Sequence, residues 1–213
     1  FKKKPTYEIL LSLVGSEMCI RAGYKPVLGN GLVTSEGDFW LRQRKLAQPA
    51  FLKNRVLSYA PVMSDLTHAM LAKWRPDLHI DVNYEFSSLT SAIALKTLFG
   101  LDDAADREEF VATLRHAFDL LSDRFRDLIR LPFWLPTPRN LRTRHAIRHL
   151  YRVVDGFIAA GRHRKEPGDD LLSRLVNAQD EDGTRMTESQ LRDEAMTLYL
   201  AGHETTALTL SWS

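Results

Sequence analysis

The chain has 213 residues, of which 44% are hydrophobic, and this is enough for one large domain, or a part of one, with a substantial core. Its formal net charge is only +2, which argues against nucleic-acid binding as the main role. The single cysteine, Cys19, excludes a disulfide framework within the chain and a metal cluster built from several thiolates.

Residues 1–22 are an unassigned amino-terminal segment whose sequence fits none of the patterns that follow. Three lysines before a short apolar run are similar to a signal peptide, but Glu8 and Glu17 interrupt that pattern. A divergent strand region, a partial membrane anchor and a sequence artefact all stay open for this segment. We expect residues 23–213 to form one partial domain, incomplete at its carboxyl end, because the chain stops within an apolar helical pattern.

A glycine-rich loop, from about Gly29, leads into a short basic helix that we predict over residues 40–47. Ser35 or Asp38 is expected to be the N-cap of this helix, because their side-chain oxygens can accept from its first amides. Pro49 is expected to end it.

Trp40 and Arg44 are four residues apart and therefore lie on one face of the basic helix. An indole N–H only donates, and a guanidinium group can donate two parallel hydrogen bonds to a carboxylate. The pair could therefore bind a carboxylate group. Stacking of the arginine on the tryptophan at the protein surface would explain the same spacing.

Apolar residues at helical spacing predict further helices over residues 54–74, 82–99, 104–131 and 139–165, and from Asp169 or Asp170 to Gln179. Asp81 is expected to cap the second of these helices, and Gly100 to end it. The first contains a stripe that we interpret as ordinary core, made of Val56, Tyr59, Met63, Leu66, Met70 and Leu71.

Residues 131–138 contain three prolines and cannot be helical. This segment could be a lid, a membrane-touching tip or a packed Ω-loop. The helix that follows is rich in arginine and histidine, and we interpret its charges as a solvated face. An anionic lipid or a partner protein could also use that face.

The last part of the chain is the most informative. Thr187 and Gln190 predict a capping box at the start of a long helix, and its many apolar residues predict burial nearly all round. A polar cluster interrupts this helix, with the sequence Ala201-Gly202-His203-Glu204-Thr205-Thr206. The glycine and the two threonines lower helix stability, and the hydroxyls can bend or widen the helix by bonding to carbonyls four residues earlier. Such a defect in a buried helix is typical of a functional site.

This segment resembles the long central helix of the cytochrome P-450 family, the haem-thiolate monooxygenases. The family motif is a small residue, Gly, any residue, Asp or Glu, Thr, and then Thr or Ser, and residues 201–206 match it at every position. Trp40 and Arg44 are similar to the family's W-x-x-x-R pair, which binds a haem propionate. The resemblance implies a mainly α fold with minor β, in which a helical bundle region ends in the long central helix.

The resemblance also implies a haem cofactor (iron protoporphyrin) and a role for each matched residue. Ala201 and Gly202 would lie against the haem face. Thr205 would organise a water molecule that delivers protons, and Glu204 would relay those protons from solvent. The implied reaction inserts one atom of O2 into a small apolar substrate, by hydroxylation or epoxidation, with electrons from a ferredoxin or a flavoprotein reductase.

The family's iron ligand lies in a later F-x-x-G-x-x-x-C-x-G loop, after an E-x-x-R pair, and this chain contains neither. Cys19 has different neighbours and precedes Trp40, so we assign no metal ligand within the chain. We therefore expect the 213 residues alone to be inactive, and haem to be bound only by the full-length protein. We expect a cytoplasmic location, with membrane association left open.

Two kinds of metalloenzyme site would need residues that the chain does not have. A zinc-peptidase helix would need a second histidine at position 207, which is Ala207. A diiron oxygenase would need Glu-x-x-His ligands, which the chain lacks. Two alternatives stay open: a kinked core helix with a satisfied polar pocket, and a non-catalytic helical binding module that uses the basic helix and the proline-rich segment.

Overall fold

The structure, a computed structural model, describes residues 24–125, 132–163 and 168–213, so the interpretation of residues 1–22 lies outside it. The described residues are mainly helical, as predicted. The expected minor β content is reduced, within these ranges, to an isolated antiparallel bridge between Gln179 and Arg185. The described α-helices are α2 (Gly37–Ala47), α3 (Lys53–Ser58), α4 (Ala60–Leu71), α5 (Val82–Phe99), α6 (Ala104–Phe125), α7 (Pro138–His163), α8 (Leu171–Asn177) and α9 (Glu188–Ser211). A short 3-10 helix, η1 (Gln48–Phe51), follows α2.

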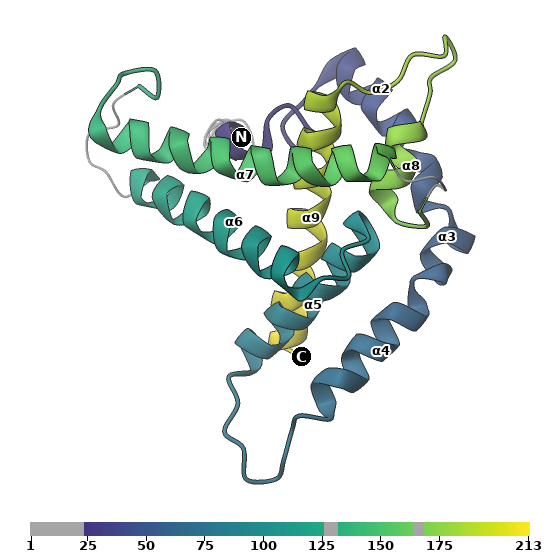
Figure 1. Ribbon diagram of the computed structural model, residues 1–213, viewed down its shortest axis with the longest axis vertical. Helices are drawn as coiled ribbons and strands as arrows, with labels where there is room; N and C mark the ends of the chain where they lie inside the picture. The colour runs from purple at the N-terminus through teal and green to yellow at the C-terminus, as the bar shows by residue number, and fades with distance from the viewer. Residues whose placement is uncertain (1–23, 126–131, 164–167) are drawn as a thin grey trace, which may run out of the picture.

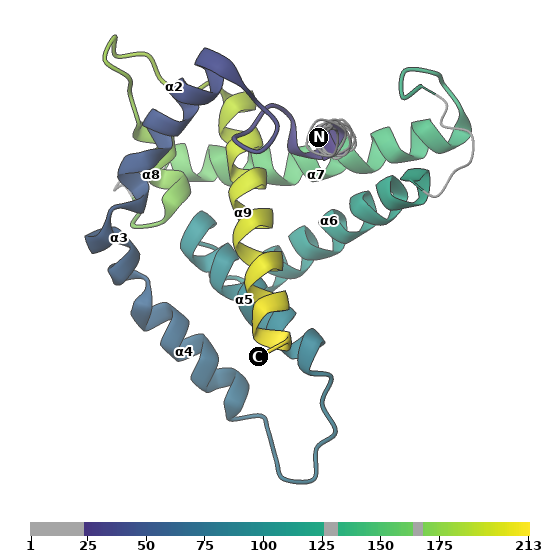
Figure 2. The ribbon, with the colours of Figure 1, turned by 180° about the vertical axis from the view of Figure 1, so that it is seen from behind.

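Helix α9 runs through the middle of the molecule, and the other helices lie across it or beside it (Figure 1). Helix α5 packs on α9 more extensively than any other described helix does. Helices α6 and α7 form an antiparallel pair that runs across α9. Helices α3 and α4 form an arm on one side, which contacts the rest mainly through α5 (Figure 2).

Aromatic rings from four helices meet where these elements cross. Phe99 of α5, Phe110 of α6 and Tyr199 of α9 are nearly or fully buried, and the rings of Phe110 and Tyr199 meet edge to face at 4.9 Å. Phe157 of α7 joins them, with its ring centroid 5.8 Å from that of Phe99. The hydroxyl groups of Tyr199 and Ser91 lie 2.8 Å apart, so the buried phenol has a hydrogen-bond partner.

Several helix ends lie where the sequence predicts them. The Asp81 carboxylate accepts a hydrogen bond from the Tyr84 amide at 3.1 Å, and Gly100 ends α5 with a left-handed φ of 65°. The capping box of α9 is also confirmed, because the Thr187 hydroxyl and the Gln190 side chain each accept from the other residue's amide.

The single helix predicted over residues 54–74 is wrong, because the structure has two helices, α3 and α4, that meet at Tyr59. Pro61 lies in the first turn of α4, where its missing N–H and fixed φ are tolerated, so a new helix starts there. The predicted core stripe is also wrong for most of its members. Of these six residues only Met70 is buried, and Val56, Met63 and Leu71 are exposed.

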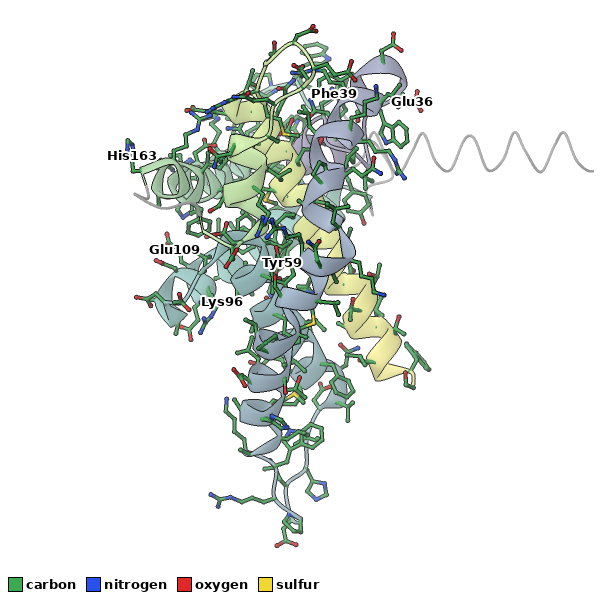
Figure 3. All side chains as sticks on the ribbon, turned by 90° about the vertical axis from the view of Figure 1, so that its right-hand side faces the viewer. Glu36, Phe39, Tyr59, Lys96, Glu109 and His163 are labelled. Carbon is green, nitrogen blue, oxygen red and sulfur yellow. The ribbon has the colours of Figure 1, made fainter. Side chains whose placement is uncertain are left out.

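Helix α9 differs from the prediction of burial nearly all round. Its first half is buried among the other helices, but its second half is exposed, and Trp212 near its end is 87% exposed. Figure 3 shows the last turns of α9 extending beyond the helices that pack on its first half. The α-helical pattern is continuous from Glu188 to Ser211, so the expected widening of the helix is absent.

Residues 132–137 are non-helical, as predicted, and Leu131 lies outside the described residues. The prediction is wrong for Pro138, which is the first residue of α7, a position where proline is tolerated. The buried Asn140 side chain donates hydrogen bonds to the carbonyls of Pro132, at 3.0 Å, and Leu135, at 2.8 Å, which favours a packed loop over a mobile one. Trp134 at its tip is 72% exposed. None of the helices in the described ranges combines the length and the apolar character that crossing a bilayer requires.

Candidate functional site

The polar motif of residues 201–206 lies on the exposed half of α9. Ala201, Gly202, Glu204 and Thr205 are all exposed. A Cβ atom added to Gly202 would meet no other atom within 4 Å, so the described helices leave this face of α9 open. Small side chains on an open helix face leave room for a flat ligand to lie against the backbone.

Thr205 and Thr206 behave differently. The Thr205 hydroxyl donates a hydrogen bond to the carbonyl of Ala201, as the sequence predicts, and Thr209 repeats this pattern by donating to the carbonyl of Thr205 at 2.8 Å. Thr206 makes no such bond among the described residues. The Thr205 oxygen keeps lone pairs that can accept from another donor, which is what a water-organising group needs.

His203 points away from the open face and into the aromatic cluster. Its ring packs edge to face on Tyr199, with 5.3 Å between ring centroids. Burial lowers the pKa of His203, so its imidazole is neutral at pH 7. This residue therefore belongs to the packing between α9 and its neighbours, and the zinc-peptidase interpretation loses its first ligand as well as its second.

Trp40 and Arg44 lie together on α2, with the guanidinium carbon 5.3 Å from the centre of the indole ring. Among the described residues no acidic side chain forms an ion pair with Arg44, whereas Arg42 on the same helix bonds Asp180 at 2.9 Å. The surface stacking that the sequence allowed is therefore present. An exposed guanidinium beside an indole N–H also has the donor chemistry that a carboxylate such as a haem propionate requires.

The structure adds a contact that the sequence analysis did not predict, between the glycine-rich loop and the first half of α9. The amide of Asn30 donates to the Asp193 carboxylate at 2.7 Å, and the amide of Leu32 donates to the Glu194 carboxylate at 3.1 Å. These two adjacent acids join segments that are more than 160 residues apart in sequence. We call Asp193 and Glu194 the carboxylate clamp.

The loop approaches α9 so closely that glycine is required at two positions. Gly29 has a φ of +60°, and a Cβ atom there would lie 2.1 Å from the Asp193 carboxylate. A Cβ atom at Gly31 would lie 2.2 Å from the Thr197 hydroxyl and 2.6 Å from the backbone oxygen of Asp193. The second clash involves backbone, so a change of side-chain rotamer cannot relieve it.

Burial perturbs both acids of the clamp. Glu194 is only 1% exposed, and burial raises its pKa to about 7, although the Leu32 amide opposes this rise. The nearby charge of Asp193 raises it further. Burial also raises the pKa of Asp193, against the opposing effects of the Asn30 amide and the Arg192 charge. One oxygen of Glu194 has no hydrogen-bond partner among the described residues.

The predicted site residues thus fall into two groups, the pair on α2 and the motif on α9. Among the described residues, no hydrogen bond or ring contact joins these groups directly. They are connected through the carboxylate clamp, since the loop that it holds leads directly into α2 (Gly37–Ala47). The structure describes no cluster of three or more residues able to hold a metal ion within its ranges, and Cys19 lies outside them.

Comparison with known proteins identifies relatives of this chain. The family model described as Cytochrome P450 matches residues 16–213. Cyclooctatin synthase of Streptomyces melanosporofaciens is 37% identical over 196 residues, which cover 89% of this chain and 42% of that protein. Pentalenene oxygenase of Streptomyces avermitilis is 35% identical, over 88% of this chain and 42% of that protein.

Solved structures have the same fold. A structure titled "Retinoic acid bound cyanobacterial CYP120A1" superposes with a TM-score of 0.70 at 24% identity, covering 86% of this chain and 41% of that one. The chain therefore spans about two fifths of the length of the proteins that it matches.

Proposed function

The chain belongs to the cytochrome P450 family, and we propose that it is part of a longer haem-thiolate monooxygenase, here called the full-length protein. In this proposal, Trp40 and Arg44 hold a haem propionate, and the open face of α9 around Gly202 lies over the haem. The observation that carries the proposal is that open face, where Ala201 and Gly202 are exposed beside Thr205.

The bound haem would supply oxygen activation on its iron, while the protein would position substrate and deliver protons. The Thr205 hydroxyl would hold a water molecule above the haem face, with its own hydrogen donated to the Ala201 carbonyl. Exposed Glu204 would exchange protons between that water and solvent. The iron ligand would come from the part of the full-length protein that follows Ser213, so the 213 residues alone would be inactive.

The name pentalenene oxygenase supports insertion of oxygen into an organic molecule as the reaction. We propose a small apolar substrate and O2 as the reactants, and a ferredoxin or a flavoprotein reductase as the electron donor. The open face of α9 supports an apolar substrate, because exposed Leu208 and Leu210 follow the polar motif.

Replacing Trp40 by alanine in the full-length protein is expected to speed haem loss by roughly tenfold, because the propionate loses its indole donor. The measurement is the rate of haem transfer to an excess of apomyoglobin. Trp134→Ala, which removes an exposed tryptophan in the proline-rich segment, is the matched control and should leave that rate unchanged. Full haem retention in Trp40→Ala would remove the propionate assignment.

Replacing Thr205 by alanine should lower the amount of product formed per electron pair consumed by roughly tenfold, because proton delivery loses its positioning hydroxyl. Reductant consumption and product are measured together. Thr209→Ala is the control, because that hydroxyl makes the same kind of bond to a carbonyl one turn later. Equal coupling in Thr205→Ala and the wild type would exclude this role for the hydroxyl.

A further inference from the structure

We infer that Asp193 and Glu194 are positioning residues for the propionate-binding pair, because they fix the loop from which α2 starts. This inference rests on the proposed function. Neither residue belongs to the family motif, and neither lies on the open face of α9. Their effect on haem binding would therefore be indirect, through the backbone of the glycine-rich loop.

The first step of the argument is the rigidity of the contact. Each of the two carboxyl groups accepts a hydrogen bond from a different loop amide. Because Gly29 and Gly31 have no side chain, the loop can lie directly against α9. A loop held by two hydrogen bonds, at 2.7 and 3.1 Å, and packed this closely has little freedom to slide along the helix.

The second step is the connection from the loop to α2. The Thr34 hydroxyl donates to the carbonyls of Gly29, at 2.8 Å, and Gly31, at 3.2 Å, and the amides of Thr34 and Ser35 also donate to Gly31. The amide of Trp40 then donates to the Glu36 carbonyl. Consecutive hydrogen-bonded turns therefore run from the clamp to the tryptophan.

The third step is a second attachment of α2 to the segment that leads into α9. Arg42 bonds Asp180 at 2.9 Å, in the turn between α8 and α9, and Asp180 also accepts from the Thr184 amide at 2.7 Å. With α2 held at its amino end and at its middle, the orientation of Trp40 and Arg44 relative to α9 is fixed. Figure 3 shows the start of α2, where Glu36 and Phe39 are labelled, beside the first turns of α9.

The inference is tested with four variants of the full-length protein. Asp193→Ala and Glu194→Ala remove the acceptors, and Asp193→Asn and Glu194→Gln keep an oxygen in place. We expect haem transfer to apomyoglobin to be roughly tenfold faster in the alanine variants and near the wild-type rate in the amide variants. Asp81→Ala removes a carboxylate–amide bond of the same kind at α5, remote from α2, and should leave the rate unchanged.

A double-mutant cycle separates positioning from general destabilisation. If the clamp acts through the propionate pair, Glu194→Ala should speed haem loss much less in a Trp40→Ala background than in the wild type. Independent, multiplicative effects of the two substitutions would overturn the inference, as would unchanged haem loss in both alanine variants.

A measurement without haem examines the clamp itself. In the apoprotein, hydrogen exchange at the Leu32 amide should rise in Glu194→Ala, and exchange at the Asn30 amide should rise in Asp193→Ala. Unchanged exchange at both amides would overturn the positioning inference and leave the proposed function intact. Failure of the wild-type protein to take up haem would overturn both.

Discussion

Replacing Gly31 by alanine is expected to lower the free energy of unfolding by about 3 kcal/mol. The new methyl group would lie 2.6 Å from the backbone oxygen of Asp193 and 2.2 Å from the Thr197 hydroxyl. Relief of these contacts requires the loop to move away from α9, and that movement breaks the hydrogen bonds of the carboxylate clamp. Chemical denaturation of the purified variant measures the loss.

Gly156→Ala is the matched control, because Gly156 lies within α7 and a Cβ atom there would meet nothing within 4 Å. Alanine is the better helix former, so this variant should gain about 0.5–1 kcal/mol. Equal stability of Gly31→Ala and the wild type would show that the loop does not lie against α9 as described.

Replacing Glu194 by glutamine should remove a pH dependence of stability. The pKa of Glu194 in the folded protein is about 7, well above its ordinary value of 4.5. A carboxyl group with a raised pKa favours folding while it is protonated. Its contribution is complete below pH ~4.5 and is lost as the pH rises through 7. Between those limits the wild type should lose roughly 3 kcal/mol relative to the glutamine variant.

The measurement is the free energy of unfolding at several pH values from 4.5 to 8.5 for both proteins. The difference between the two proteins reports Glu194, because half-buried His203 and Asp193 are present in both. The lowered pKa of His203 affects stability in the opposite direction, and the raised pKa of Asp193 in the same direction as Glu194. Two parallel pH profiles would contradict the burial of an unpaired carboxyl oxygen at this position.

The sequence predicted those helix ends that are capped by residues close by in the chain. Asp81, Gly100 and the Thr187–Gln190 box all lie within five residues of the groups that they satisfy, so short-range chemistry decides them. The predicted N-cap of α2 was wrong because the start of that helix depends on residues far away in the sequence. Glu36 occupies the N-cap position and its side chain does not cap the helix, because long-range contacts of the loop decide where the chain turns.

Hydropathy predicted how apolar a helix is but not what covers it. Leu208 and Leu210 of α9 are exposed among the described residues, although they are apolar. The same holds for three members of the stripe on α3 and α4, namely Val56, Met63 and Leu71. Burial depends on which elements lie opposite, and periodicity along one helix contains no information about them.

Two features of the sequence indicated the carboxylate clamp, although hydrophobic periodicity could not reveal it. Asp193 and Glu194 are two consecutive acids in a segment that was predicted to be buried, and a buried carboxylate requires donors. The glycines at positions 29 and 31 indicated a close backbone approach. What could not be predicted was that these two features, 162 residues apart, satisfy each other.

Residues of the predicted site differ in how much the structure supports them. Trp40 and Arg44 share one face of α2, as their spacing predicts, and Ala201 and Gly202 are both exposed on α9. Their roles toward haem stay predictions.

The reduced, carbon-monoxide difference spectrum tests the central claim most directly. It should be recorded for the full-length protein and for the 213 residues alone, each reconstituted with haem. We predict a Soret band typical of thiolate-ligated haem in the full-length protein and no such band in the 213 residues. A full-length protein without that band, or the band in the 213 residues alone, would contradict the account.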